Sequence, residues 1–269
     1  MPRSTVPETM PVSDIDSFRP SLDRPVRVRA RALPADTHFE PHSHAWSQLA
    51  YCASGIVQVA AQQEHGGEIT YIIPLSRAVW IAPGAQHAIH VLEDAQFRTL
   101  YIDASATPPG WSGCRVIVVS PLLRELVQAL DAQLAPAREE LLGELALDEI
   151  AHADIQALGV PLPRSQAGDK RLRALCEAVL KAPAHRATLA DWAAEVGASE
   201  RTIARLFREE LGTSYQQWRQ QAILAHALPM LARGAPVSHV AASSGYASDS
   251  AFTVMFKAAM GQPPSQFRA

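Results

Sequence analysis

The stretch "ASERTIARLFREELGTSYQQWR", residues 198–219, has a near copy at residues 247–268, "ASDSAFTVMFKAAMGQPPSQFR". In both stretches apolar residues recur at spacings of three and four, which indicates amphipathic helices that pack one face against a core. The pattern occurs only in the last hundred residues. It therefore predicts that a structural unit is doubled in the C-terminal part of the chain.

The two copies correspond over a first helix, a turn and a second helix. Over the first helix and the turn, the offset between the copies is 48: the first copy has Leu189, Trp192, Ala193 and Gly197 where the second has Val237, Val240, Ala241 and Gly245. Over the second helix and beyond, the offset is 49: the first copy has Ser199, Ile203, Phe207, Arg208, Gly212, Trp218 and Arg219 where the second has Ser248, Phe252, Phe256, Lys257, Gly261, Phe267 and Arg268. Gly197 and Gly245 stand where the first helix ends, and glycine adopts the left-handed conformation of such an end at little cost.

Helix-capping residues mark where each helix begins. Thr188 and Asp191 have the spacing of a capping box, and Ser199 and Ser248 are suitable N-caps for the second helix of each copy. Two helices joined by a tight turn that contains glycine form a helix-turn-helix. We therefore expect two such motifs, at residues 188–210 and 236–260.

The outward residues of the second helices are the predicted DNA contacts. They are Ser199, Glu200, Arg201, Thr202, Ala204, Arg205 and Arg208 in the first copy, and Ser248, Asp249, Ser250, Thr253, Val254 and Lys257 in the second. In a major groove these side chains can reach base edges and phosphates. An ordinary solvated helix face is the alternative for one copy, but the doubling favours DNA binding.

A connecting helix is predicted within residues 214–234. About 16 helical residues span about 24 Å, which suits two recognition helices placed about one DNA turn, roughly 34 Å, apart. Pro229 is expected to bend or end this helix.

The tandem motif resembles the DNA-binding domain of the AraC/XylS family of bacterial transcription regulators, over residues 169–269. The resemblance implies a domain of seven helices that binds double-stranded DNA. The second recognition helix of that family often carries Arg where this chain has Val254. Arg201 and Arg205 are therefore the expected base-contacting residues.

Residues 26–120 have the texture of a β domain. Short stretches such as "VRVRARAL", "WSQLAYCA" and "FRTLYID" are rich in β-branched and aromatic residues and are separated by Gly, Pro and polar clusters. Strands at this spacing, with no helices between them, indicate a sandwich or small barrel.

Within this domain, "PHSHAWSQ" and "PGAQH" resemble the two cupin motifs. The resemblance brings together His42, His44, Gln48 and His87 as candidate ligands of a divalent metal (Zn, Ni or Fe). Gln48 stands where metal-binding cupins usually have Glu, and a neutral amide is a poorer ligand. The alternatives are a metal-free effector pocket and satisfied polar groups, with Trp46 and Trp80 able to stack on an aromatic effector or simply to pack.

These resemblances together imply an α+β multidomain chain with four segments. They are a flexible arm at 1–25, a cupin-like effector-sensing β-barrel at 26–120, a helical dimerisation segment and linker at 121–168, and an all-α DNA-binding domain with two helix-turn-helix motifs at 169–269. Leu122, Leu126, Leu130 and Leu134 form a possible dimerisation stripe in the helical segment. The alternative is a helix packed on the barrel itself.

The charge is distributed unevenly along the chain. Residues 1–165 hold 12 Lys/Arg and 19 Asp/Glu, net −7, whereas residues 166–269 hold 12 and 8, net +4. A basic segment attached to an acidic one suggests that the C-terminal part meets a polyanion.

We therefore expect a cytoplasmic one-component transcription regulator, an activator or a repressor, and not an enzyme. Apolar runs too short for a bilayer, the absence of an apolar export signal and three scattered cysteines fit that location. The expected partners are double-stranded DNA, a small-molecule effector, a second copy of the chain and, for an activator, RNA polymerase. The alternatives are a cupin-type metal-dependent enzyme with a helical appendage, and a DNA-binding protein whose β domain serves only to dimerise.

Overall fold

The computed structural model describes residues 9–10, 15–62, 67–74, 76–156, 158–163, 168–185 and 188–267. The chain divides into two compact units, the first made of Met1–Gln63 with Tyr71–Leu158 and the second of Glu64–Thr70 with Gly159–Ala269. No helix among the described residues is long and apolar enough to cross a bilayer.

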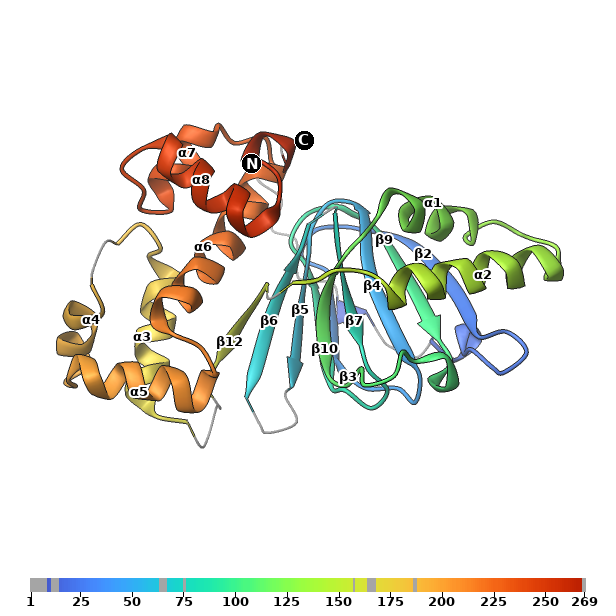
Figure 1. Cartoon of the computed structure of the whole chain (residues 1–269), viewed down its shortest axis with the longest axis horizontal. Coiled ribbons are helices and arrows are strands. Elements are labelled where there is room, and N and C mark those ends of the chain that lie inside the picture. The colour runs from blue at the N-terminus through green and yellow to red at the C-terminus, as the bar shows by residue number, and fades with distance from the viewer. Residues whose placement is uncertain are drawn as a thin grey trace. The chain divides into compact units, whose positions relative to one another are not determined.

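The first unit is built from two β-sheets. Its strands are β1 (Thr9–Met10), β2 (Val26–Leu33), β3 (His38–His42), β4 (Ser47–Ser54), β5 (Val57–Gln62), β6 (Glu68–Ile73), β7 (Arg77–Ile81), β8 (His87–Val91), β9 (Ala95–Ile102), β10 (Cys114–Val118) and β11 (Ile155–Gln156). One sheet has the order β1-β3-β8-β5-β6 and the other β11-β10-β7-β4-β9-β2. The expected β-rich N-terminal domain is confirmed, and in the second sheet β4 lies between β7 and β9 (Figure 1).

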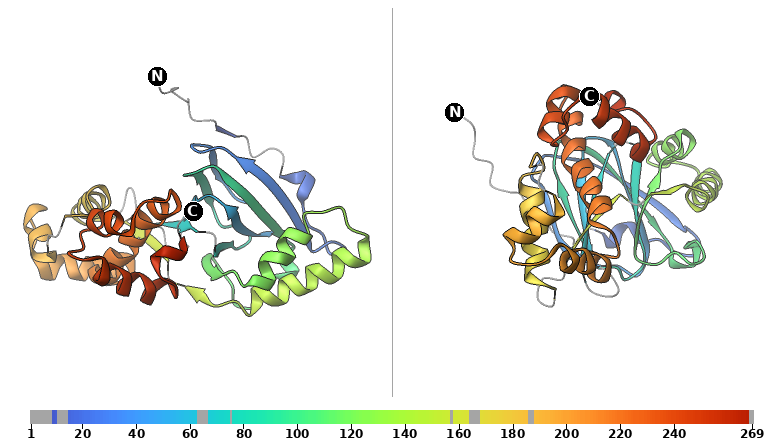
Figure 2. Two further views of the ribbon diagram at one scale, coloured as in Figure 1. Left: turned by 90° about the horizontal axis from the view of Figure 1, so that it is seen from above. Right: turned by 60° about the vertical axis from the view of Figure 1, so that its left-hand side comes forward.

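Two helices cover the outer face of the second sheet. They are α1 (Pro121–Ala129) and α2 (Pro136–Ala151), and they pack there in both further views (Figure 2). Leu49, Trp80 and Leu100 of the sheet share one buried cluster with Leu123 and Ile150 of the helices. Burial of such side chains contributes about 1.5–3 kcal/mol each, so these helices belong to the core of the unit.

The predicted leucine stripe is divided by this packing. Leu126 and Leu130 are 5% and 8% exposed and pack on the sheet, and Leu134 is partly buried against the same cluster. Leu122 alone of the four is exposed, at 50%. A spacing of four residues follows one helix face, but here that face turns toward the barrel, as the alternative interpretation had it.

The N-terminal arm is only partly described. Residues 1–8 and 11–14 lie outside the described residues. Asp16–Phe18 form a 3-10 helix, η2, and Ile15 is buried against Trp46 and Tyr101, with Phe18 packed on the same cluster. Residues 15–18 of the expected flexible arm are therefore packed against the barrel. A further 3-10 helix, η3, covers Ala104–Ala106.

The second unit is helical, as predicted. Its elements are β12 (Gly159–Leu162), α3 (Lys170–Lys181), α4 (Leu189–Glu195), α5 (Glu200–Leu211), α6 (Tyr215–Ala232), α7 (Val237–Ser243), α8 (Asp249–Met260) and the 3-10 helix η4 (Pro264–Phe267). The pairs α4–α5 and α7–α8 lie at opposite ends of α6 (Figure 1). The described residues thus hold six α-helices and one 3-10 helix in this unit.

Residues 159–162, which their composition predicts to be linker, form the strand β12 instead. β12 is hydrogen-bonded to β6, whose residues Glu68–Thr70 belong to the same unit. Val160 is buried with Leu172 and Trp192 in the helical core. The indole Nε1 of Trp218 donates to the Pro161 carbonyl oxygen at 2.7 Å. The segment before α3 is therefore part of the second unit's core, while linker residues 164–167 lie outside the described residues.

The connecting helix is longer than the sequence predicts. α6 has 18 residues and Pro229 lies inside it, not at its end. At about 1.5 Å per residue the helix spans about 27 Å. The missing N–H of Pro229 removes only one hydrogen bond near the last turn, and Arg233 N still bonds to Pro229 O.

Candidate functional site

Both helix-turn-helix motifs have the predicted local structure. Thr188 and Asp191 form a reciprocal capping box at the start of α4. Ser199 and Ser248 cap α5 and α8, and their hydroxyl oxygens accept hydrogen bonds from Thr202 N and Ala251 N. Satisfying these free N–H groups stabilises each helix start and fixes where the second helix begins.

The repeated core positions are buried in both copies. The buried residues are Trp192, Ala193, Ile203 and Phe207 in the first motif, and Val240, Ala241, Phe252 and Phe256 in the second. The inward face of each recognition helix is therefore used for packing, and the opposite face stays open.

All of the predicted DNA-contact residues are exposed or partly exposed. Exposed residues are Ser199, Glu200, Arg201, Arg205, Arg208, Ser248, Asp249, Ser250, Val254 and Lys257, and partly exposed ones are Thr202, Ala204 and Thr253. Val254 is 71% exposed. None of these side chains has to leave a core to reach a ligand.

The charged groups of α5 are held loosely. Arg205 pairs with Glu209 one turn later at 2.6 Å, and both side chains are more than half exposed. An exposed pair of this kind contributes about 0–1 kcal/mol. Arg205 can therefore exchange Glu209 for a phosphate or a guanine at little cost.

A cluster of three histidines lies in the first unit. Antiparallel pairing of β3 with β8 sets His42 opposite His87, and their ring centroids are 4.3 Å apart. His44 lies in the loop after β3, and its ring is 5.1 Å from that of His87. One ring nitrogen from each residue lies within 4.8 Å of the others.

The neighbouring polar group is Gln48 on β4. Its Oε1 lies 2.8 Å from Nε2 of His44, and Gln48 and His87 are 2% and 1% exposed. The structure thus brings together all four residues that the cupin resemblance implies as ligands.

Burial keeps two of these imidazoles neutral. Burial, with a smaller contribution from nearby His42, lowers the pKa of His87 to about 3. Burial also lowers the pKa of His42. At neutral pH both rings therefore offer a nitrogen lone pair.

Aromatic residues border the cluster on one side. Trp46 stacks on His44 with centroids 5.2 Å apart and an interplanar angle of 5°, and Tyr101 meets Trp46 edge-on. Tyr101 lies opposite Gln48 in the β4–β9 register. Tyr101 and Ile15 were missed by the sequence analysis, although the alternation of Phe97, Thr99 and Tyr101 points to a shared face of β9.

Trp80 does not join this group. It is paired with Leu49 on β4, whereas Gln48 is paired with Ile81. Adjacent residues of a strand point to opposite faces, so Trp80 is directed toward α1 and α2 and meets Trp111 edge-on. The predicted role of Trp80 in an effector pocket is therefore wrong.

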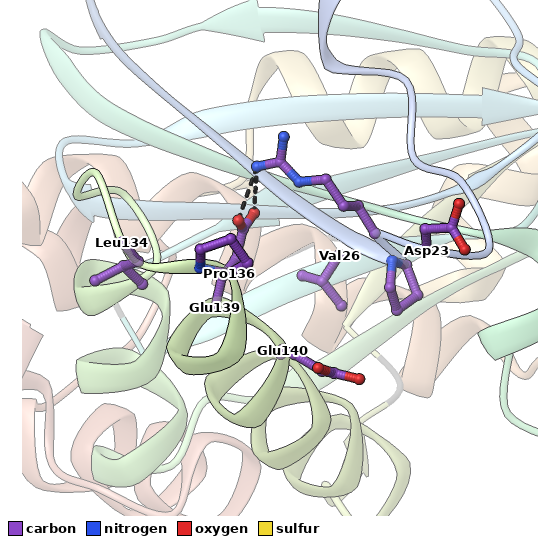
Figure 3. A pocket seen from close by; sticks show the side chains of 9 residues that line it. Asp23, Val26, Leu134, Pro136, Glu139 and Glu140 are labelled. Atoms are coloured by element: carbon purple, nitrogen blue, oxygen red, sulfur yellow. Dashed lines mark hydrogen bonds and ion pairs between the residues drawn. The ribbon is translucent and has the colours of Figure 1, made fainter.

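A surface cavity of about 300 Å³ lies elsewhere in the first unit, where β2 begins beside α2 (Figure 3). Nη2 of Arg24 contacts both carboxylate oxygens of Glu139, at 2.6 and 2.8 Å, across its mouth. Asp23 and Glu140 add acidic groups. This polar, open cavity contains none of the predicted site residues.

Two family models match the chain. The AraC-like ligand binding domain matches residues 24–159, and a helix-turn-helix domain matches residues 192–269.

Individual proteins are similar as well. The HTH-type transcriptional regulator NimR of Escherichia coli (strain K12) is 33% identical over 233 residues, which are 85% of this chain and 81% of NimR. The HTH-type transcriptional regulator RipA of Corynebacterium glutamicum is 32% identical over 108 residues, which are 40% of this chain and 32% of RipA. The crystal structure of ToxT from Vibrio cholerae O395 aligns with 90% of this chain and 96% of its own, at 14% identity and a TM-score of 0.37.

Proposed function

This chain belongs to the AraC family of HTH-type transcription regulators, and on that premise we propose that α5 and α8 enter successive major-groove segments of a specific DNA site. Arg201 and Arg205 are the proposed base-reading residues. Arg208 and Lys257, at equivalent positions of the two helices, are the proposed phosphate contacts.

The exposed faces of α5 and α8 carry this proposal. Each helix buries its Phe-containing side and leaves the whole predicted contact set accessible. An α6 of about 27 Å, together with the width of the helices that it joins, suits sites roughly 34 Å apart.

Selection from a random DNA library by the full chain, followed by a salt titration of the enriched site, tests the proposal. We expect two half-sites centred about 10 base pairs apart. The logarithm of the affinity should fall linearly with the logarithm of the salt concentration, with a slope of about −0.9 per phosphate contact. Absence of any enriched sequence would refute specific DNA binding.

The first unit is the proposed sensor. The barrel side that carries Gln48, Tyr101 and the three histidines supports a small-molecule or metal effector there. An effector shifts DNA binding only if it binds one state of the sensor more tightly than another. Thermal stabilisation of the chain by a candidate effector is the first measurement.

We also propose that the chain forms a homodimer through the sensor, but through exposed leucines of α1 and α2, of which only Leu122 belongs to the predicted leucine stripe. Leu122 of α1 and Leu141 and Leu145 of α2 are exposed by 50%, 57% and 43%. Sedimentation of the full chain against Leu141→Glu tests it, and a wild-type monomer at micromolar concentration would contradict it.

We further propose that the chain acts in the cytoplasm and contacts RNA polymerase if it activates. Relatives named as transcriptional regulators support a regulator over the metal-dependent enzyme. Turnover with oxygen consumption by the iron-loaded protein would favour the enzyme instead.

A further inference from the structure

We propose that His42, His44 and His87 bind one divalent transition metal ion through their Nε2 atoms. The β3–β8 register and the loop after β3 already hold one nitrogen of each ring within 4.8 Å of the other two. A Zn–N bond of about 2.0–2.1 Å places tetrahedral ligand nitrogens about 3.3 Å apart. Nitrogens that are 4.8 Å apart have to approach each other by about 1.5 Å to reach this separation, so metal binding requires side-chain rotations of the three rings.

The tautomer of each ring is fixed by the backbone. Nδ1 of His42 lies 2.8 Å from the Glu40 carbonyl oxygen, Nδ1 of His44 lies 2.5 Å from that of Trp46, and Nδ1 of His87 lies 2.9 Å from that of Ala85. A carbonyl oxygen only accepts, so Nδ1 carries the proton in all three neutral rings and Nε2 keeps its lone pair. Histidines that ligate metals in proteins are oriented by this kind of second hydrogen bond.

The buried Nε2 of His87 supplies an independent observation. This atom is inaccessible to solvent and has no hydrogen-bond partner among the described residues. Burying a nitrogen lone pair without a partner costs free energy, and a bound metal ion would supply that partner. The ring that carries this nitrogen, His87, is only 1% exposed.

Gln48 completes the surroundings of His44. Its amide lies 2.8 Å from Nε2, with Oε1 on that side. A half-turn of the amide presents the NH₂ group, which can donate to Nε2 when no metal is bound. Because an amide is a weak ligand, the three imidazoles carry the affinity, and a fourth position stays available to another donor.

The donor set selects the class of metal. Three neutral imidazoles with no carboxylate suit Zn²⁺, Ni²⁺ or Fe²⁺, whereas Mg²⁺ and Ca²⁺ require oxygen ligands. Metal binding is a property of the first unit, and its use as a regulatory signal rests on the proposed function.

Titration of the chelator-treated full chain with ZnCl₂ in a calorimeter tests the inference, with visible absorption of bound Co²⁺ as a second readout. We expect one ion per chain and no heat with MgCl₂. His42→Ala and His44→Ala should each weaken Zn²⁺ binding at least about 100-fold, because loss of an outer partner alone typically costs 10–100-fold. His152→Ala, which removes an exposed histidine at the end of α2, should bind as the wild type does.

Failure of the wild type to bind Zn²⁺ stoichiometrically would overturn the inference, as would undiminished binding in both variants. Circular dichroism melts show whether the variants fold. If His44→Ala does not fold, His44→Gln, which retains polar atoms at that position, is measured in its place. Metal binding is measured without DNA, so a failure to bind Zn²⁺ would not contradict the proposed DNA binding. A failure to select a DNA site would likewise not contradict the metal site.

Discussion

Arg205 and Val254 occupy the same position in the two recognition helices, 49 residues apart, and both side chains are largely exposed. Arginine can donate two hydrogen bonds to a guanine, whereas valine offers only apolar contact. The first motif is therefore expected to read its half-site more sharply than the second.

Replacement of Arg205 by Ala should weaken binding to the selected site by about 5- to 150-fold, which corresponds to about 1–3 kcal/mol for one bidentate base contact. The equivalent Val254→Ala change should alter affinity by less than about threefold, since it removes no hydrogen bond. Fluorescence anisotropy with the selected duplex measures both. Equal losses in the two variants would show that these helices do not differ in base reading.

The sequence predicts residue roles well where they depend on local spacing. The caps at Thr188, Ser199 and Ser248 each join residues three positions apart, so the local order of residues determines them. The face taken by Trp80 depends on its pairing with Leu49, 31 residues away in the chain. Because a shift of one residue reverses every side chain of a strand, this role could not be read from the local pattern.

At the scale of the elements, Gly197 and Gly245 end the first helix of each motif with positive φ angles of 69° and 82°. A Cβ on Gly197 would meet no atom within 4 Å, but one on Gly245 would lie 3.0 Å from the Ala184 carbonyl oxygen. The two turns are alike in backbone conformation and differ in what surrounds them.

Gly197→Ala should destabilise the chain by about 1–2 kcal/mol, the cost of a left-handed alanine. Gly245→Ala should cost more, about 3 kcal/mol or above, because the backbone at Ala184 must also move. Urea unfolding monitored by circular dichroism compares them, with Gly197→Ala as the matched control. Equal destabilisation would mean that the backbone at Ala184 moves aside at no measurable cost in the free energy of unfolding.

Element type could be predicted for the periodic segments but not for every short one. The α4–α5 and α7–α8 pairs follow from two clear repeats, whereas β12 contains Pro161 and is followed by Pro163, and prolines normally indicate a loop. Its strand conformation depends on pairing with β6 and on the Trp218 contact, both distant in sequence. The helix face with Leu126 and Leu130 was predicted correctly as apolar, but its partner could not be inferred from periodicity.

At the scale of the molecule, the C-terminal segment of the second unit begins at β12 and not at α3, and Glu64–Thr70 belong to the same unit. A fragment of residues 159–269 lacks β6 but retains both partners of the Trp218–Pro161 hydrogen bond and the buried Val160, whereas a fragment of residues 169–269 lacks Pro161 and Val160. The longer fragment should be more stable by about 2–4 kcal/mol, from one buried hydrogen bond and one buried valine.

Both fragments should bind the selected DNA, and neither should respond to an effector of the first unit. Urea denaturation and anisotropy on the two fragments measure these properties. If the shorter fragment proved as stable as the longer one, β12 would be dispensable to the helical core.

The strand β4 connects the histidine cluster to the helices on the other face of the sheet. Gln48 points to the histidines, and its neighbour Leu49, one peptide bond away, is wedged beneath α1 and α2. A ligand that moves Gln48 by a fraction of an ångström is expected to move Leu49 as well, because close-packed interiors transmit strain. We therefore expect a ligand bound beside Gln48 on one face of the sheet to shift α1 and α2 on the other face.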